Sequence, residues 1–92
     1  MNKPERREVH YSGRVQGVGF RYTTREIAER FEVSGFVENL PDGRVRLVAE
    51  GDPAELDRFL EAVSNRFERY IASADVRSRA ATDEFDDFSI RH

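Results

Sequence analysis

The stretch VSGFVENLPDGRVRLVAE, residues 33–50, contains two strand-like segments joined by a turn. Residues 33–40 are rich in β-branched and aromatic side chains, and apolar and polar side chains alternate over residues 44–50. Residues 41–43 are Pro-Asp-Gly, in which proline presets its φ angle and glycine accepts a positive φ, so a tight turn is favoured. We therefore predict a β-hairpin, and the elements on either side of it decide the fold.

A helix is predicted directly after the hairpin. Asp52 is a suitable N-cap, Pro53 is favoured at the first helical position, and Glu55 places a carboxylate in the first turn. An apolar stripe at helical spacing follows, formed by Leu56, Phe59, Leu60, Val63 and Phe67. Two weaker strands are expected after this helix, over residues 71–81 and 85–91.

A strand and a helix are also predicted before the hairpin. Residues 8–15 alternate in the manner of a half-buried strand, and residues 20–31 carry an apolar stripe at helical spacing. Residues 1–7, MNKPERR, contain no apolar segment, so we expect a disordered N-terminal extension followed by a single domain over residues 8–92.

The predicted order of elements is βαββαβ with an added C-terminal strand. This order is typical of the ferredoxin-like α+β sandwich, in which two helices pack on one face of an antiparallel sheet. Because crossovers are right-handed, they leave room for a further strand between the first strand and the second. We expect that strand to be the second arm of the hairpin.

The composition excludes several classes of function. A net charge of −3 argues against nucleic acid as the main partner, because phosphate backbones require a basic surface. The absence of cysteine excludes disulfides, thiolate nucleophiles and cysteine metal sites, and is compatible with a reducing compartment. No apolar run is long enough to cross a membrane. We expect a cytoplasmic monomer with neither a nucleic-acid nor a membrane partner.

The segment GRVQGVGFR, residues 13–21, is the first candidate for a functional site. It joins the first predicted strand to the first helix, where unpaired backbone N–H groups and the positive end of the helix dipole attract anions. Arg21 adds a guanidinium group, which matches phosphate oxygens in a bidentate manner. The segment fits neither the P-loop nor the dinucleotide-binding pattern. From these residues alone, it is either an anion-binding loop or a tight connection with a solvated arginine.

Asn39, at the end of the first hairpin strand, is the second candidate. A loop that folds back over the sheet would bring its amides beside this residue, and an asparagine side chain can orient a water molecule although it cannot act as a base. An asparagine before Pro-Asp-Gly is also a common turn former. The residue is therefore compatible with both a catalytic and a purely structural role.

Two segments of the chain resemble the signatures of the acylphosphatase family. They are residues 13–21 and residues 35–45, GFVENLPDGRV, with Gly51 beyond them. The resemblance covers residues 8–92 in element order and is looser in the last third. It implies the ferredoxin-like fold and hydrolysis of the carboxyl-phosphate bond of acyl phosphates to a carboxylate and inorganic phosphate, with no metal and no cofactor.

The resemblance also implies roles for individual residues. Arg21 would bind the phosphoryl group, and Asn39 would hold the attacking water. The backbone amides that complete the phosphate site would be those of Gln16, Gly17, Val18, Gly19 and Phe20. Inorganic phosphate or sulfate would bind there as product or inhibitor. Relatives commonly carry a Gly-Pro pair after the second helix where this chain reads RFERYI, residues 66–71, so we expect a longer helix and a shifted strand.

Other interpretations of the same residues stay open. A non-catalytic ferredoxin-like module could use the loop to bind a small anion or a protein partner, because a fold alone does not determine function. A related site could instead act on carbamoyl phosphate, as in the acylphosphatase-like domains of larger maturation enzymes. His10 and His92 lack the spacing of a metal site, and Ser12 lacks a base that would make it a nucleophile.

Overall fold

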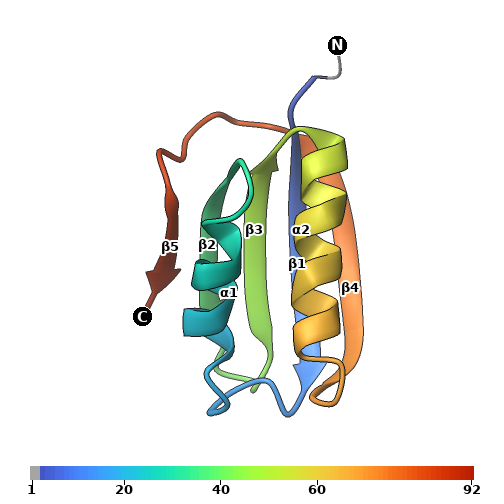
Figure 1. The fold of residues 1–92 in the computed structure, drawn as a ribbon. Helices are drawn as coiled ribbons and strands as arrows, with labels where there is room; N and C mark the ends of the chain where they lie inside the picture. The colour runs from blue at the N-terminus through green and yellow to red at the C-terminus, as the bar shows by residue number, and fades with distance from the viewer. Residues whose placement is uncertain (1–2) are drawn as a thin grey trace.

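Seven elements follow one another in the computed structural model, which describes residues 3–92 (Figure 1). They are β1 (Glu5–Gly13), α1 (Phe20–Ala28), β2 (Val33–Asn39), β3 (Val45–Gly51), α2 (Pro53–Arg66), β4 (Ile71–Ala80) and β5 (Phe88–Arg91). The strands form one sheet in the order β4-β1-β3-β2-β5, and both helices cover the same face of it. The predicted α+β sandwich is confirmed, with β3 between β1 and β2. No helix within residues 3–92 is long and apolar enough to span a membrane.

The sheet is mixed, so the prediction of a purely antiparallel sheet is wrong at one edge. Four strands pair in antiparallel fashion, but β5 runs parallel to β2, with Gly35 opposite Phe88 and Glu38 opposite Arg91. The end of β4 lies beside the start of β1, where Glu5 pairs with Ala80. The chain then crosses the upper end of the sheet in Figure 1 and enters β5 at the end where β2 also begins. This crossing gives β5 and β2 the same direction.

The first strand begins earlier than predicted. β1 starts at Glu5 and pairs with both β3 and β4, so the expectation of a disordered extension over residues 1–7 is wrong for residues 5–7. The charged side chains of this segment form ion pairs: the Arg7 guanidinium lies 2.6 Å from the Asp57 carboxylate of α2. The part of that prediction concerning residues 1–2 lies outside the described residues. A search for apolar alternation misses a strand whose side chains form ion pairs.

The core lies between the helices and the sheet and determines where α1 begins. Phe20, the first residue of α1, is 2% exposed, and its ring stacks on that of Phe67 with centroids 4.4 Å apart. The Phe20 ring also contacts Tyr11 of β1 at 5.1 Å. The second helix begins as predicted, because the Asp52 side chain accepts a hydrogen bond from the Ala54 N–H at 3.2 Å. The glycine-rich segment therefore joins two rigidly packed elements.

The segment over residues 66–71 does not extend the second helix. α2 ends at Arg66, and the N–H groups of Tyr70 and Ile71 donate to the Phe67 carbonyl at 2.9 and 3.0 Å. β4 then begins at Ile71, where it was predicted to begin. The expectation that this helix is longer than in relatives, and the following strand shifted, stays a prediction. Phe67, the residue after the helix, is 1% exposed, and its ring stacks on that of Phe20.

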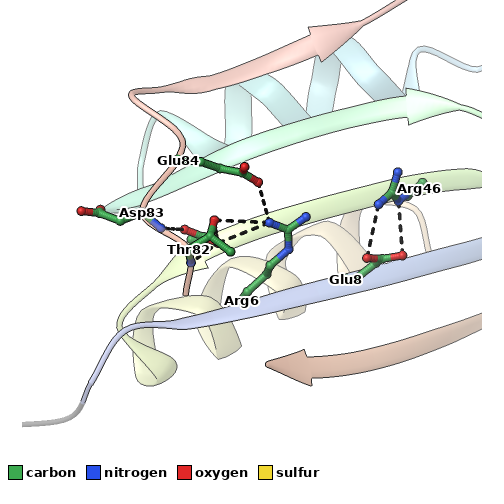
Figure 2. A network of polar contacts seen from close by, with 7 residues as sticks. Arg6, Glu8, Arg46, Thr82, Asp83 and Glu84 are labelled. Atoms are coloured by element: carbon green, nitrogen blue, oxygen red, sulfur yellow. Dashed lines mark hydrogen bonds and ion pairs between the residues drawn. The ribbon is translucent and has the colours of Figure 1, made fainter. Parts of the chain in front are cut away.

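A buried carboxylate anchors the connection between β4 and β5. Glu50 is 4% exposed and accepts hydrogen bonds from the Thr82 N–H at 2.8 Å, the Thr82 hydroxyl at 2.9 Å and the Asp83 N–H at 2.9 Å. Figure 2 shows Arg6, Thr82, Asp83 and Glu84 meeting at this end of the sheet, where the Arg6 guanidinium lies 2.7 Å from the Glu84 carboxylate. Burial by itself raises the pKa of Glu50, but the hydrogen bonds and the Arg6 charge outweigh it and lower that pKa.

Candidate active site

The glycine loop leaves the start of α1 open to an anion. Gly17 and Gly19 both have φ angles of +78°, a left-handed conformation that glycine adopts at little cost. Gly19 is the N-cap of α1, no side chain caps this end of the helix, and the first turn contains no acidic residue. The positive end of the helix dipole is therefore not neutralised from within the helix, and an anion can bind to its free N–H groups.

The side chain of Gln16 ties this loop to the turn between β2 and β3. Its amide group donates hydrogen bonds to the Leu40 carbonyl at 2.8 Å and the Arg44 carbonyl at 2.9 Å. Only the backbone of Gln16 was predicted to take part in the site, so the role of its side chain was missed. Its partners lie 24 and 28 residues further along the chain, so no local pattern could have indicated these contacts.

Asn39 lies at the same end of the sheet as the loop. It is the last residue of β2, where it pairs with Val45 of β3. Because β1 and β2 are both antiparallel to β3, their C-terminal ends lie at the same end of the sheet, which is also where α1 begins (Figure 1). The loop therefore need not cross the sheet to meet Asn39, and the topology alone brings them together.

A pocket of about 280 Å³ joins the candidate residues. It is lined by Val15, Gly17, Gly19, Phe20, Arg21, Tyr22 and Asn39. Five of the seven residues predicted for the site line it, whereas Gln16 and Val18 lie beside it without lining it. Tyr22 also lines it, although the sequence motifs gave no reason to predict that residue for the site. A larger pocket, of about 530 Å³, lies near Glu5 and Arg79, at the start of β1 and the end of β4.

The Arg21 guanidinium is available to an anion. Its Nη1 donates to the backbone carbonyl of Arg91, at the end of β5, at 3.4 Å. Within residues 3–92 it forms no ion pair with a carboxylate, so its charge is not neutralised by the protein. The contact places the guanidinium between the loop and the edge strand, beside the pocket that Asn39 also lines. A cation, free amides and a side-chain amide thus converge on one small volume.

Comparisons with known proteins point to one family. The family model described as acylphosphatase matches residues 7–90. A curated acylphosphatase from Salinibacter ruber is 44% identical over 89 residues, which cover 95% of this chain and 93% of the relative. One from Archaeoglobus fulgidus is 53% identical over 58 residues, 63% of this chain and 65% of the relative. The chain spans about half to two thirds of the length of this relative and of two others.

The fold comparison leads to the same family. The crystal structure of acylphosphatase from Bacillus subtilis superimposes with a TM-score of 0.86 and 33% sequence identity, covering 96% of this chain and 99% of that one. Given the match over residues 7–90 and this superposition, the chain belongs to the acylphosphatase family.

Proposed function

We propose that this protein hydrolyses acyl phosphates at the pocket formed by the glycine loop, Arg21 and Asn39. The observation that carries the proposal is the convergence of those three features, from α1, β2 and the loop between β1 and α1, on one pocket. Membership of the acylphosphatase family supports the same reaction class. The substrate is a small molecule that carries a carboxyl-phosphate mixed anhydride.

The phosphoryl group binds to the backbone N–H groups of residues 16–20 and to the Arg21 guanidinium. Two N–H donors of a guanidinium fit two phosphate oxygens, and the dipole of α1 adds a favourable potential at the same point. In the transition state of phosphoryl transfer, charge is spread over the three equatorial oxygens, so these donors stabilise the charge that develops. Inorganic phosphate and sulfate offer the same oxygens and bind as product or inhibitor.

Asn39 orients the attacking water in line with the leaving group. The oxygen of the water forms a bond to phosphorus while the bond from phosphorus to the acyl oxygen breaks, and the electron pair of that bond leaves on the carboxylate. Both protons of the water end on the phosphate, which is released as dihydrogen phosphate. Because a carboxylate is a good leaving group, the reaction needs positioning more than a strong base, and a side-chain amide is sufficient.

Hydrolysis of benzoyl phosphate by the purified protein tests this proposal. We expect turnover in the presence of a chelator and none of a stable phosphate monoester under the same conditions. Asn39→Ala should lower kcat at least a hundredfold while the inhibition constant for phosphate changes less than threefold, because the phosphate donors remain. Activity only on the monoester, loss of activity with the chelator, or a fully active Asn39→Ala variant would each contradict the proposed mechanism.

Arg21→Lys separates charge from geometry at the phosphate site. Lysine keeps the positive charge but loses the fork of paired donors, so the inhibition constant for phosphate should rise at least tenfold. An unchanged constant would mean that Arg21 does not bind the phosphoryl group. A monomeric state and a cytoplasmic location stay predictions from the sequence, which sedimentation and cell fractionation can test.

A further inference from the structure

We infer that Tyr22, together with Val18, forms an acyl-group subsite beside the phosphate pocket, and that this subsite selects acyl phosphates with aromatic acyl groups. The inference rests on the proposed function, because it assigns the part of the substrate that the phosphate donors leave unbound. Neither side chain has a role in the chemistry described above, to which Val18 contributes only its backbone N–H group.

Large exposed hydrophobic residues are few within residues 3–92, and two of them lie at or beside the pocket. Within residues 3–92 the large hydrophobic residues that are exposed are Val18, Tyr22 and Val76, with exposed fractions of 36%, 51% and 49%. Val18 lies between the two glycines of the loop, and Tyr22 lies in the first turn of α1. Val76 lies on the edge strand β4. Two of the three therefore flank the proposed phosphate site, where an apolar surface is available to a substrate.

The backbone of α1 directs the Tyr22 side chain toward the pocket. Side chains on a helix lean toward its N-terminus, and the N-terminus of α1 is the proposed anion site. Tyr22 accordingly lines the pocket, beside Gly19 and Arg21. The Arg25 guanidinium, one turn further along α1, lies over the Tyr22 ring at 5.8 Å from its centroid. This cation–π contact favours the orientation of a ring that is otherwise half exposed.

Two buried residues close the inner side of the pocket. Its floor is formed by Val15 and Phe20, which are 0% and 2% exposed, so a substrate cannot extend inward. With the phosphoryl group on the loop amides and Arg21, the acyl group extends outward, on the side where Tyr22 lines the pocket and is exposed. An aromatic acyl group can stack on this ring or meet its edge, whereas an acetyl group offers one methyl and little contact area. The subsite therefore discriminates between acyl groups and contributes little to phosphate binding.

Binding of stable analogues tests the inference independently of catalysis. Phenacylphosphonate and acetonylphosphonate carry a methylene group in place of the scissile oxygen, so their affinities can be measured by calorimetry with the full chain. We expect the wild-type protein to bind the phenacyl compound about tenfold more tightly than the acetonyl compound. Tyr22→Ala should reduce this ratio to less than threefold, and Tyr22→Phe, which keeps the ring, should retain it. Phosphate affinity should be unchanged in both variants.

A control variant and the hydrolysis assay show whether the subsite or the proposed function is wrong. Val76→Ala removes the third exposed hydrophobic side chain, away from the pocket, and should leave the ratio as in the wild type. A wild-type ratio near one, or a Tyr22→Ala variant that keeps the tenfold ratio, would overturn the subsite. A parallel loss of affinity for both analogues and for phosphate would also overturn it, because Tyr22 would then support the phosphate site. If the wild-type protein hydrolyses neither benzoyl phosphate nor acetyl phosphate, the proposed function fails, while the analogue ratio still decides the subsite.

Discussion

Replacing Glu50 by glutamine tests the buried anchor of the connection between β4 and β5. The Oε2 atom of Glu50 accepts hydrogen bonds from the N–H and the hydroxyl of Thr82, and Oε1 accepts one from the N–H of Asp83. A glutamine side chain has nearly the same shape but only one oxygen. Its NH₂ group must therefore face at least one of these backbone donors, at a site that is 4% exposed. The Arg6 guanidinium, 3.6 Å away, also loses its negative partner there.

The expected magnitude follows from the bonds that are lost. A hydrogen bond to a charged group contributes about 1.5–3 kcal/mol, and a buried donor left without a partner costs about 1–3 kcal/mol. If the glutamine oxygen takes the place of Oε2, only the Asp83 bond is broken, and the free energy of unfolding should fall by about 2–4 kcal/mol. For a domain of this size, that corresponds to a decrease in Tm of roughly 10–25 °C.

The effect of Glu50→Gln should also depend on pH. Because the pKa of Glu50 is lowered in the folded state, its carboxylate contributes stability that is fully present above the pKa of the unfolded chain. That contribution is lost as the pH falls through the folded-state pKa, where the wild-type side chain becomes neutral as well. The difference between wild type and variant should therefore be constant near neutral pH and shrink in acid.

Urea unfolding followed by circular dichroism, at several pH values, measures both quantities. Glu84→Gln is the matched control, because it also removes a carboxylate that pairs with Arg6, but one that is 54% exposed. An exposed pair contributes little, so this control should lie within about 0.5–1 kcal/mol of the wild type. A Glu50→Gln variant as stable as the control, or a difference that does not shrink in acid, would refute the reasoning.

Three further predictions concern the loop and its neighbours. Gln16→Ala removes two hydrogen bonds to the β2–β3 turn, and urea unfolding should show a loss of about 1–2 kcal/mol; an unchanged stability would mean that these bonds do not hold the loop. Gly19→Ala should cost about 1–2 kcal/mol because of its positive φ, and Gly19→Asn should cost less, which thermal unfolding can compare. Asp52→Ala should lower stability by about 1 kcal/mol through loss of the α2 cap, and Asp52→Ser should restore most of it.

The sequence by itself determined the features that depend on local physical chemistry. The Pro-Asp-Gly turn, the Asp52 cap with Pro53, and the apolar stripes of the two helices act over a few residues, and they specify the βαββαβ order. That order brings the C-terminal ends of β1 and β2 to the same end of the sheet. The order of elements therefore places the glycine loop beside Asn39 at that end of the sheet, so the candidate site was largely predictable.

Only the tertiary structure decided the features that depend on distant partners. The early start of β1 rests on its pairing with β3 and β4, and the direction of β5 rests on where the chain crosses the sheet. The side chain of Gln16 and the carboxylate of Glu50 act on backbone groups 24 to 33 residues away. Polar contacts of this kind leave no periodic pattern along the chain, because the partner of each group is determined only when the sheet has formed.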